Sequence, residues 1–522
     1  MIFKVRTGRA LRTLARRVNF AIALMEEIRY CRGFGLGVMD PPPNHRVRRS
    51  LGLVFAERYA ALVIELAASL ALVRILTPGE IGGFAVAAAI VHVGQLLREA
   101  GATQYIIQEK ILTPAKLRAA FSLQLGLAIV VALLILVGRE PLAAFYRSPE
   151  LRTVLAVLSI AIVLVPFGSV STAVLRRELR FGAIAFIGIG ASIVQAATAV
   201  VLAVRGFGML SLAFAAVAGT IASILLAAIA RPRGLPWLPG LTGVGAALKF
   251  GSWFSIGSIA TALGNRSPEL VLGRAAGFES VAQFDKAASI VELFNRLVMQ
   301  GLWQFAAPYF AKQLRDNAPL GPVYLQATHY VTGLGVSFFA VTAIMAESMV
   351  MLLFGSQWLA ITPVLRILCI GGALGTLFGL QHSALIAMGR IKTLTKLILL
   401  VQTVKIVTIV ALSASGLMTL ATGLVISGLA CSLLIRWNLR SVVTISELLR
   451  SGCNATLMAA LASIGPLFVA QLIDPTYAHG VPALALALST AMLGWLIAAV
   501  VIRHPIRAEL RRLPAIKRYF RD

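Results

Sequence analysis

Charged and amide side chains occur at helical spacing inside apolar stretches of the chain. The longest series is Asp285, Ser289, Glu292, Arg296 and Gln300, at i, i+4, i+7, i+11 and i+15. This spacing places all five side chains on one face of a helix. A charge that faces lipid costs about 2.5–3.5 kcal/mol even on permissive insertion scales, so the face is expected to line protein or water. Two interpretations stay open: a hydrated cavity, or structural ion pairs such as Glu292 with Arg296.

Two earlier stretches also carry polar residues on one face. Arg58 and Glu65 are seven residues apart, and His92, Gln95 and Glu99 follow at i, i+3 and i+7. The guanidinium group of arginine is a rigid fork of donors that matches phosphate oxygens, so arginines in such positions could bind an anion. Carboxylates could accept hydrogen bonds from sugar hydroxyls or carry a proton.

The segment "GNRSPELVLGR" at 264–274 interrupts an apolar stretch with Asn265, Arg266 and Pro268. Proline has no N–H and its ring collides with the preceding turn, so a kink at Pro268 is expected. Interrupted helices in transporters indicate a binding site, and here they also predict a hinge. Gly371, Gly375 and Gly379 are four residues apart, which favours close packing between helices.

These side chains must be held by membrane-spanning helices. The chain has 522 residues, of which 58% are hydrophobic and 13% charged, and its mean hydropathy is +0.86. Apolar stretches long enough to cross about 30 Å of hydrocarbon recur throughout. The sequence therefore predicts an all-α polytopic membrane protein with about 14 transmembrane helices, near 51–76, 80–98, 117–138, 151–175, 183–204, 207–230, 246–274, 281–306, 322–345, 361–388, 394–415, 418–438, 455–473 and 481–502.

The net charge is +27, and the basic residues are concentrated at particular positions relative to the predicted spans. Most lysines and arginines precede the first span, follow the last one, or fall in alternate loops. This positive-inside bias predicts a multi-pass membrane protein whose two termini are cytoplasmic; the bacterial inner (plasma) membrane is the location implied by the family resemblance given below. Basic residues beside a membrane indicate anionic lipids as partners, and nucleic acid is not expected.

The first 50 residues form a basic extension with arginines at helical spacing. One interpretation is an amphipathic helix on the inner leaflet. The other is that the natural protein starts at Met39, so that residues 1–38 are not part of it. Four scattered cysteines without a CxxC pair, and the lack of motifs for phosphate loops, zinc proteases or serine hydrolases, give no reason to expect a metal, a cofactor or an enzyme.

An internal repeat relates the stretch after residue 50 to the stretch after residue 250. At an offset of 200 residues Arg74 meets Arg274, Gln104 meets Gln304 and Glu65 meets Asn265. Both copies enter the membrane in the same direction, which predicts two parallel six-helix lobes plus two C-terminal helices. The expected parts are an extension at 1–50, lobes at 51–230 and 231–438, extra spans at 439–502 and a basic tail at 503–522.

The first copy is broken after Arg74 by "TPGE". Thr77 and Glu80 fit a capping box, in which the threonine caps the next helix and the glutamate reaches back. This break therefore indicates a tight turn at the outer face of the membrane.

The stretches "FAERYAALVIELAASLALVRILTPGEIGGFAVAAAIV" (55–91) and "LREAGATQYIIQEKILTPAKLRAAF" (97–121) resemble the opening of polysaccharide exporters and oligosaccharide flippases of the Wzx type. These proteins share a superfamily with lipid II flippases and multidrug extruders. The resemblance implies a flippase that moves an undecaprenyl-pyrophosphate-linked oligosaccharide across the membrane by alternating access, with a proton or sodium ion as a possible coupling ion.

The resemblance and the polar faces together suggest which residues bind the substrate. Arg58, Arg266, Arg274 and Arg296 are expected to bind the anion, with Asn265 beside them, while Glu65, Asp285 and Glu292 would serve sugar hydroxyls or a coupling proton. Two other functions stay open: a cation-coupled multidrug extruder, which usually has few fixed cations in its cavity, and a polytopic glycosyltransferase or polymerase.

Overall fold

The computed structural model describes residues 45–99, 103, 106, 109, 112–230, 240, 244–472 and 481–502. Its side chains are described from Tyr59 onward, except most of 241–258 and 471–481. The expected N-terminal helix and the basic tail thus lie outside the described residues. Contacts divide the chain into Met1–Leu53 and Val54–Asp522, and the second unit contains the membrane-spanning helices.

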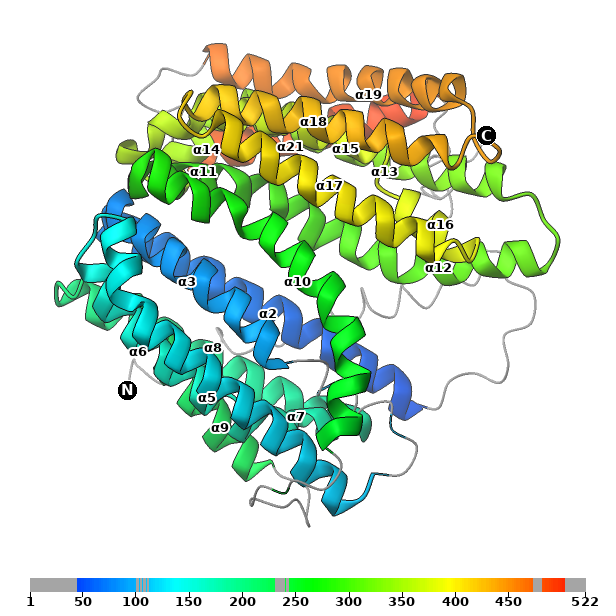
Figure 1. Cartoon of the computed structure of the whole chain (residues 1–522). Helices are drawn as coiled ribbons and strands as arrows, with labels where there is room; N and C mark the ends of the chain where they lie inside the picture. The colour runs from blue at the N-terminus through cyan, green and yellow to red at the C-terminus, as the bar shows by residue number, and fades with distance from the viewer. Residues whose placement is uncertain are drawn as a thin grey trace, which may run out of the picture. The chain divides into compact units, whose positions relative to one another are not determined.

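Long helices account for most of the described chain (Figure 1). The first half contains α2 (His45–Ile75), α3 (Pro78–Glu99), α5 (Pro114–Phe145), α6 (Glu150–Leu164), α7 (Pro166–Arg177), α8 (Phe181–Val204) and α9 (Met209–Ile229). The second half contains α10 (Val244–Ala275), α11 (Gly277–Phe294), the π turn η2 (Asn295–Met299), α12 (Gln300–Arg315), α13 (Leu320–Ile344), α14 (Ala346–Leu353), the 3-10 turn η3 (Ser356–Ile361), α15 (Thr362–Thr376), α16 (Gln381–Ala387), α17 (Ile391–Leu412), α18 (Leu417–Trp437), α19 (Ile445–Leu472) and α21 (Val481–Val501).

The membrane-spanning helices agree with those expected from the sequence. Within the described residues, 10 helices are long and apolar enough to cross a membrane, and 11 if α6 and α7, bent by 44°, form one span. The other expected spans coincide with α2, α10 and the continuous run from α11 through η2 to α12. The run beginning with α11 carries Glu279, Asp285, Lys286 and Glu292, which lower its hydropathy. The protein is an all-helical, polytopic membrane protein.

The helices of each half pack mainly against one another. In the first half, α8 lies along α9, α5 along α6, and α6 along α9. In the second half, α10 contacts α17, α17 contacts α18, and α15 contacts α11, α13 and α18, while α19 packs on α13 and carries α21 (Figure 1). Helix α3 joins the halves, because it contacts α5 and α6 on one side and α10 and α11 on the other.

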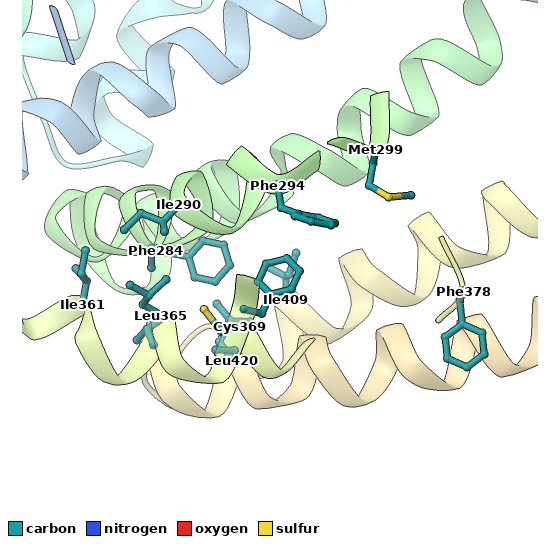
Figure 2. Close-up of a cluster of buried hydrophobic side chains, with 14 of the residues drawn as sticks. Phe284, Ile290, Phe294, Met299, Ile361, Leu365, Cys369, Phe378, Ile409 and Leu420 are labelled. Atoms are coloured by element: carbon teal, nitrogen blue, oxygen red, sulfur yellow. The ribbon is translucent and has the colours of Figure 1, made fainter. Parts of the chain in front are cut away.

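One face of α11 packs in a large apolar core. Phe284, Ile290 and Phe294 on this helix belong to the same buried apolar cluster as Leu365 and Cys369 of α15 (Figure 2). Phe294 is 2% exposed, and its ring lies 5.3 and 5.2 Å from those of Phe338 and Phe339. Burial of such aromatic rings holds α11 in one rotation about its axis, so its polar face has a defined direction.

The turn before α3 is capped as expected. The Thr77 backbone N–H and hydroxyl donate to Glu80 Oε2 at 2.8 and 2.9 Å, and the Glu80 N–H donates to Thr77 Oγ1 at 3.3 Å. These reciprocal bonds satisfy donors that the start of the helix would otherwise leave free. The capping box at Thr77 is confirmed.

The two repeated arginines each reach the opposite half of the molecule. At the end of α2, Arg74 Nη2 donates to the Leu352 carbonyl of α14 at 2.6 Å. At the end of α10, the Arg274 guanidinium lies 5.4 Å from the ring centre of Phe145, which ends α5. Next to it, the Tyr146 hydroxyl donates to the Leu270 carbonyl at 3.0 Å. We call the contacts of Arg74 and Arg274 the arginine clamp.

Of the three glycines expected to pack closely in the tenth span, two do so. A Cβ on Gly371 would lie 2.7 Å from Val425, and one on Gly379 would lie 2.7 Å from Met299. A Cβ on Gly375 would meet no atom within 4 Å. Close packing is therefore wrong for Gly375, which faces open space.

Candidate functional site

A cavity of about 590 Å³ lies between α3, α10, α11, α17 and α18. Its lining combines charged and polar side chains with apolar ones such as Phe284, Val401 and Leu424. The polar and charged side chains that line it are His92, Asn265, Arg266, Glu269, Asp285, Ser289, Glu292, Arg296, Lys405 and Ser427. Polar groups of this kind are costly at membrane depth unless they face water or one another, and here they share one cavity.

Helix α11 supplies one wall of the cavity. Asp285, Ser289 and Glu292 line it because residues at i, i+4 and i+7 share a helical face. Arg296, the fourth residue of the predicted series, also lines it, but Gln300 does not. Gln300 follows the π turn at Asn295–Met299, in which the helix departs from regular α geometry. Such turns are frequent at functional sites.

Helix α10 supplies the opposite wall through Asn265, Arg266 and Pro268. The helix runs without interruption from Val244 to Ala275, with Pro268 inside it. Pro268 cannot donate a backbone bond to the carbonyl of Gly264, and the Ser267 hydroxyl donates to that carbonyl instead, at 2.8 Å. A side-chain donor thus replaces the bond that proline removes, which is how proline is tolerated in membrane helices.

An ion pair within α10 and a hydrogen bond from α17 to α10 line the cavity wall. Arg266 Nη1 lies 2.9 Å from Glu269 Oε1, and Lys405 Nζ donates to Asn265 Oδ1 at 3.3 Å. Glu269 is 7% exposed, and its Oε2 has no hydrogen-bond partner in the structure. A buried carboxylate oxygen without a donor is costly.

Arg296 differs from the other cations of the cavity. Glu292 Oε2 accepts from Asn295 Nδ2 at 2.9 Å, and the Glu292–Arg296 ion pair, one of the two interpretations that the sequence left open, is not formed among the described residues. Asp285 lies 3.9 Å from its neighbour Lys286. Among the described residues no carboxylate lies within ion-pair distance of the Arg296 guanidinium, whose donors therefore face the cavity.

Three predicted site residues lie elsewhere. The side chain of Arg58 falls outside the described residues. Glu65 is exposed on α2 and does not line the cavity. Arg274 sits in the last turn of α10, on the ring of Phe145, because the helix carries it beyond the cavity wall that Asn265 and Arg266 form.

Sequence reasoning misses two charged residues of the cavity. Glu269 follows Pro268 in the quoted segment "GNRSPELVLGR", and its place one turn after Arg266 could have revealed it. Lys405 is a single charge within the apolar stretch "LILLVQTVKIVTIVAL", which is itself a signal that the residue faces a polar site. His92, on a face with Gln95 and Glu99, lines the cavity from α3.

Comparison with known families decides what kind of protein contains this cavity. Residues 71–363, more than half of the chain, match the family model described as "Polysaccharide biosynthesis protein". The chain belongs to this family. In the described part of the chain, no three His, Cys, Asp or Glu side chains gather as a metal site.

Curated relatives of this family member are named as transport or biosynthesis proteins. The chain is 26% identical over 341 residues to the succinoglycan biosynthesis transport protein ExoT of Rhizobium meliloti, covering 64% of this chain and 67% of the relative. It is 27% identical over 328 residues to the lipopolysaccharide biosynthesis protein WzxC of Escherichia coli, covering 61% and 65%. The match to the teichuronic acid biosynthesis protein TuaB of Bacillus subtilis covers 57% of this chain and 62% of the relative, at 24% identity. The last two matches span less than two thirds of the relative's length.

Solved structures share the fold. The lipid II flippase MurJ in an inward closed conformation matches with a TM-score of 0.70, 13% identity and coverage of 88% of this chain and 99% of its own. An inward-facing multidrug transporter of the MATE family matches with a TM-score of 0.54, 16% identity and coverage of 81% and 98%. This member of the polysaccharide biosynthesis family is therefore a multi-pass membrane protein that shares its fold with these structures.

Proposed function

We propose that the protein is a flippase that moves an undecaprenyl-pyrophosphate-linked oligosaccharide from the inner to the outer leaflet. The observation that carries this proposal is a polar cavity in a membrane-spanning helical body, with one arginine, Arg296, free of any carboxylate among the described residues. A pyrophosphate with sugars cannot cross hydrocarbon unshielded, and a cavity with cations and hydrogen-bonding walls lowers that barrier.

In this proposal Arg296 binds the pyrophosphate. Its guanidinium group can donate two parallel hydrogen bonds to phosphate oxygens, and no internal pair has to break first. Arg266 is a weaker candidate because it is already paired with Glu269 at 2.9 Å. Lys405, beside Asn265, is a third cation within the same cavity.

The carboxylates of the cavity would bind the sugars. Asp285 and Glu292 line the same wall as Ser289, and all three can accept hydrogen bonds from hydroxyl groups. A volume of about 590 Å³ is in the range of sites for drug-sized ligands, so it would hold the pyrophosphate and the sugars next to it.

Alternating access would move this cavity between the two faces of the membrane. We propose that α10 bends at Pro268, where the Ser267 hydroxyl keeps the Gly264 carbonyl satisfied during the change. The lobes at 51–230 and 231–438, the cytoplasmic position of both termini, and coupling to a proton or sodium ion belong to the same proposal, as does an attraction of the basic extension to anionic lipids.

The test is transport by protein reconstituted in proteoliposomes with a fluorescent polyprenyl-pyrophosphate oligosaccharide. Arg296→Ala removes a charged donor worth about 1.5–3 kcal/mol, so substrate affinity should fall by roughly ten- to more than a hundredfold. Arg296→Lys should retain part of the activity because lysine is a point charge. Arg205→Ala, at an exposed arginine outside the cavity, is the matched control.

Two results would contradict the proposal. Wild-type protein that leaves the lipid in its original leaflet but exports cationic dyes would indicate a multidrug extruder instead. Transport by Arg296→Ala at the wild-type rate would show that the pyrophosphate does not bind where we place it.

A further inference from the structure

A second, apolar recess adjoins the charged cavity. It has a volume of about 290 Å³ and lies between α11, α15 and α18. The two spaces share Leu424 and Gly428 of α18 as a common wall. On α11 the neighbouring residues Val291 and Glu292 divide between them, since Val291 lines the recess and Glu292 lines the cavity.

Two glycines leave the recess open. A Cβ added to Gly375 or to Gly428 would meet no atom within 4 Å, whereas the glycines just before Gly375 are packed: a Cβ on Gly372 would lie 2.6 Å from the Phe339 ring. Gly371 and Gly372 therefore serve helix packing, and Gly375 and Gly428 border empty space. The other walls are mainly apolar, among them Leu368, Phe378 and Leu429.

We infer that this recess binds the first isoprene units of the lipid carrier while the pyrophosphate lies in the charged cavity. The inference rests on the proposed function and adds a separate site for the tail. The carrier's first carbons are bonded directly to the phosphate, so they must lie within a few bonds of the group that Arg296 holds.

The physical reason is the polarity of the cavity. Apolar carbons left beside Arg266, Glu269 and Lys405 would stay in contact with water and ions. Each square ångström of apolar surface removed from water stabilises the complex by about 25 cal/mol. A recess with apolar walls that shares Leu424 and Gly428 with the cavity can remove this surface from water without moving the pyrophosphate.

The size of the recess limits what it can hold. At about 290 Å³ it lies just below the usual range of sites for drug-sized molecules, so it takes the start of the tail and not the whole polyprenyl chain. The remaining units would extend into lipid, where a protein surface has little advantage over other acyl chains. The recess should therefore distinguish ligands by their first isoprene units.

The experiment compares two soluble ligands on purified protein in lipid nanodiscs. One is a sugar diphosphate without a tail, and the other is the same sugar diphosphate esterified to a chain of two isoprene units. Wild-type protein should bind the second at least tenfold more tightly. Gly375→Leu should reduce this ratio to about one, while the affinity for the tail-free ligand stays within twofold of wild type, because Gly375 lines the recess and not the cavity. Gly428→Leu, on the wall that both spaces share, should also reduce the ratio.

Matched variants separate the recess from the cavity. Ala430→Leu adds a similar side chain to the same helix at an exposed position outside both spaces, and should keep the wild-type ratio. Arg296→Ala should weaken both ligands and keep the ratio. If the leucine variants do not fold, Gly428→Ala and Gly375→Ala place one methyl group in the open space and should lower the ratio in part.

The outcomes are distinguishable. If folded Gly428→Leu and Gly375→Leu keep the full tenfold ratio, the recess does not bind the isoprene units. The same result is expected if a membrane phospholipid fills the recess. In either case the proposed function stays intact. Equal binding of both ligands by wild-type protein would also overturn it. Failure of wild-type protein to bind either ligand would instead contradict the proposed function.

Discussion

The arginine clamp should hold one end of the cavity closed. Arg74 and Arg274 end α2 and α10, and each contacts the opposite half: a hydrogen bond of 2.6 Å to the Leu352 carbonyl, and a guanidinium 5.4 Å from the Phe145 ring. Both contacts must break if the halves separate at this end. Arg74→Ala and Arg274→Ala should therefore favour the conformation that is open there.

The size of the effect follows from the two contacts. A hydrogen bond from a charged donor contributes about 1.5–3 kcal/mol, and the lower value of about 1.5 kcal/mol applies to an exposed pair such as this one. A cation–π contact at an exposed site contributes about 0.5–1 kcal/mol. The contacts share no residue, so their effects should add. The double variant should shift the equilibrium by about 2–2.5 kcal/mol, or roughly 30- to 60-fold, and Arg74→Ala alone by about tenfold.

Spin labels can measure this shift. Arg152 on α6 and Glu347 on α14 are exposed and belong to opposite halves, so a pair of labels there would report separation as a distance distribution by pulsed electron resonance. The double variant should gain a longer distance, and Arg205→Ala should not. A distribution identical to wild type in the double variant would refute the idea that the clamp stabilises the closed state.

Three further predictions concern the hinge, the cap and the topology. Ser267→Ala should leave the Gly264 carbonyl without a donor and lower the free energy of unfolding by about 1–3 kcal/mol, measured as loss of thermal stability in detergent; stability equal to wild type would contradict this role. Thr77→Ala should lower the free energy of unfolding by about 1 kcal/mol in the same assay because α3 loses its cap. An unchanged stability would show that the capping box is dispensable. Cysteines at Gly138 and Lys392 should be labelled from outside and inside the cell respectively, and equal labelling of both from outside would contradict the proposed topology.

The sequence predicts much of the cavity because a polar residue within a membrane-spanning helix is costly unless it faces protein or water. Asp285, Ser289, Glu292 and Arg296 follow from spacing alone, and all four line the cavity. Gln300, the last residue of the series, does not line it, and the π turn that precedes it is a local backbone feature that apolar periodicity does not show. The prediction that Arg274 lines the cavity also fails, since the repeat shows its equivalence to Arg74 and not the direction of its side chain.

Other features of the site needed tertiary structure. The bond from Lys405 to Asn265 depends on the rotation of α10 and on which helix lies beside it. Nor does spacing separate Gly371, which packs on Val425, from Gly375, which faces open space. Spacing identifies the polar helices, and packing decides which of their charges stay unpaired.

The mixture of charges on the cavity wall has a consequence for the energy source of transport. Its described lining residues include three permanent cations, Arg266, Arg296 and Lys405, and three carboxylates, Glu269, Asp285 and Glu292. With all six ionised the wall has no net charge, so the pyrophosphate would carry its two negative charges across the membrane uncompensated. A potential that is negative inside would assist that outward movement by about 2.3 kcal/mol per charge for each 100 mV, or about 4.6 kcal/mol for both. Export would then be electrogenic, and the membrane voltage itself could drive it.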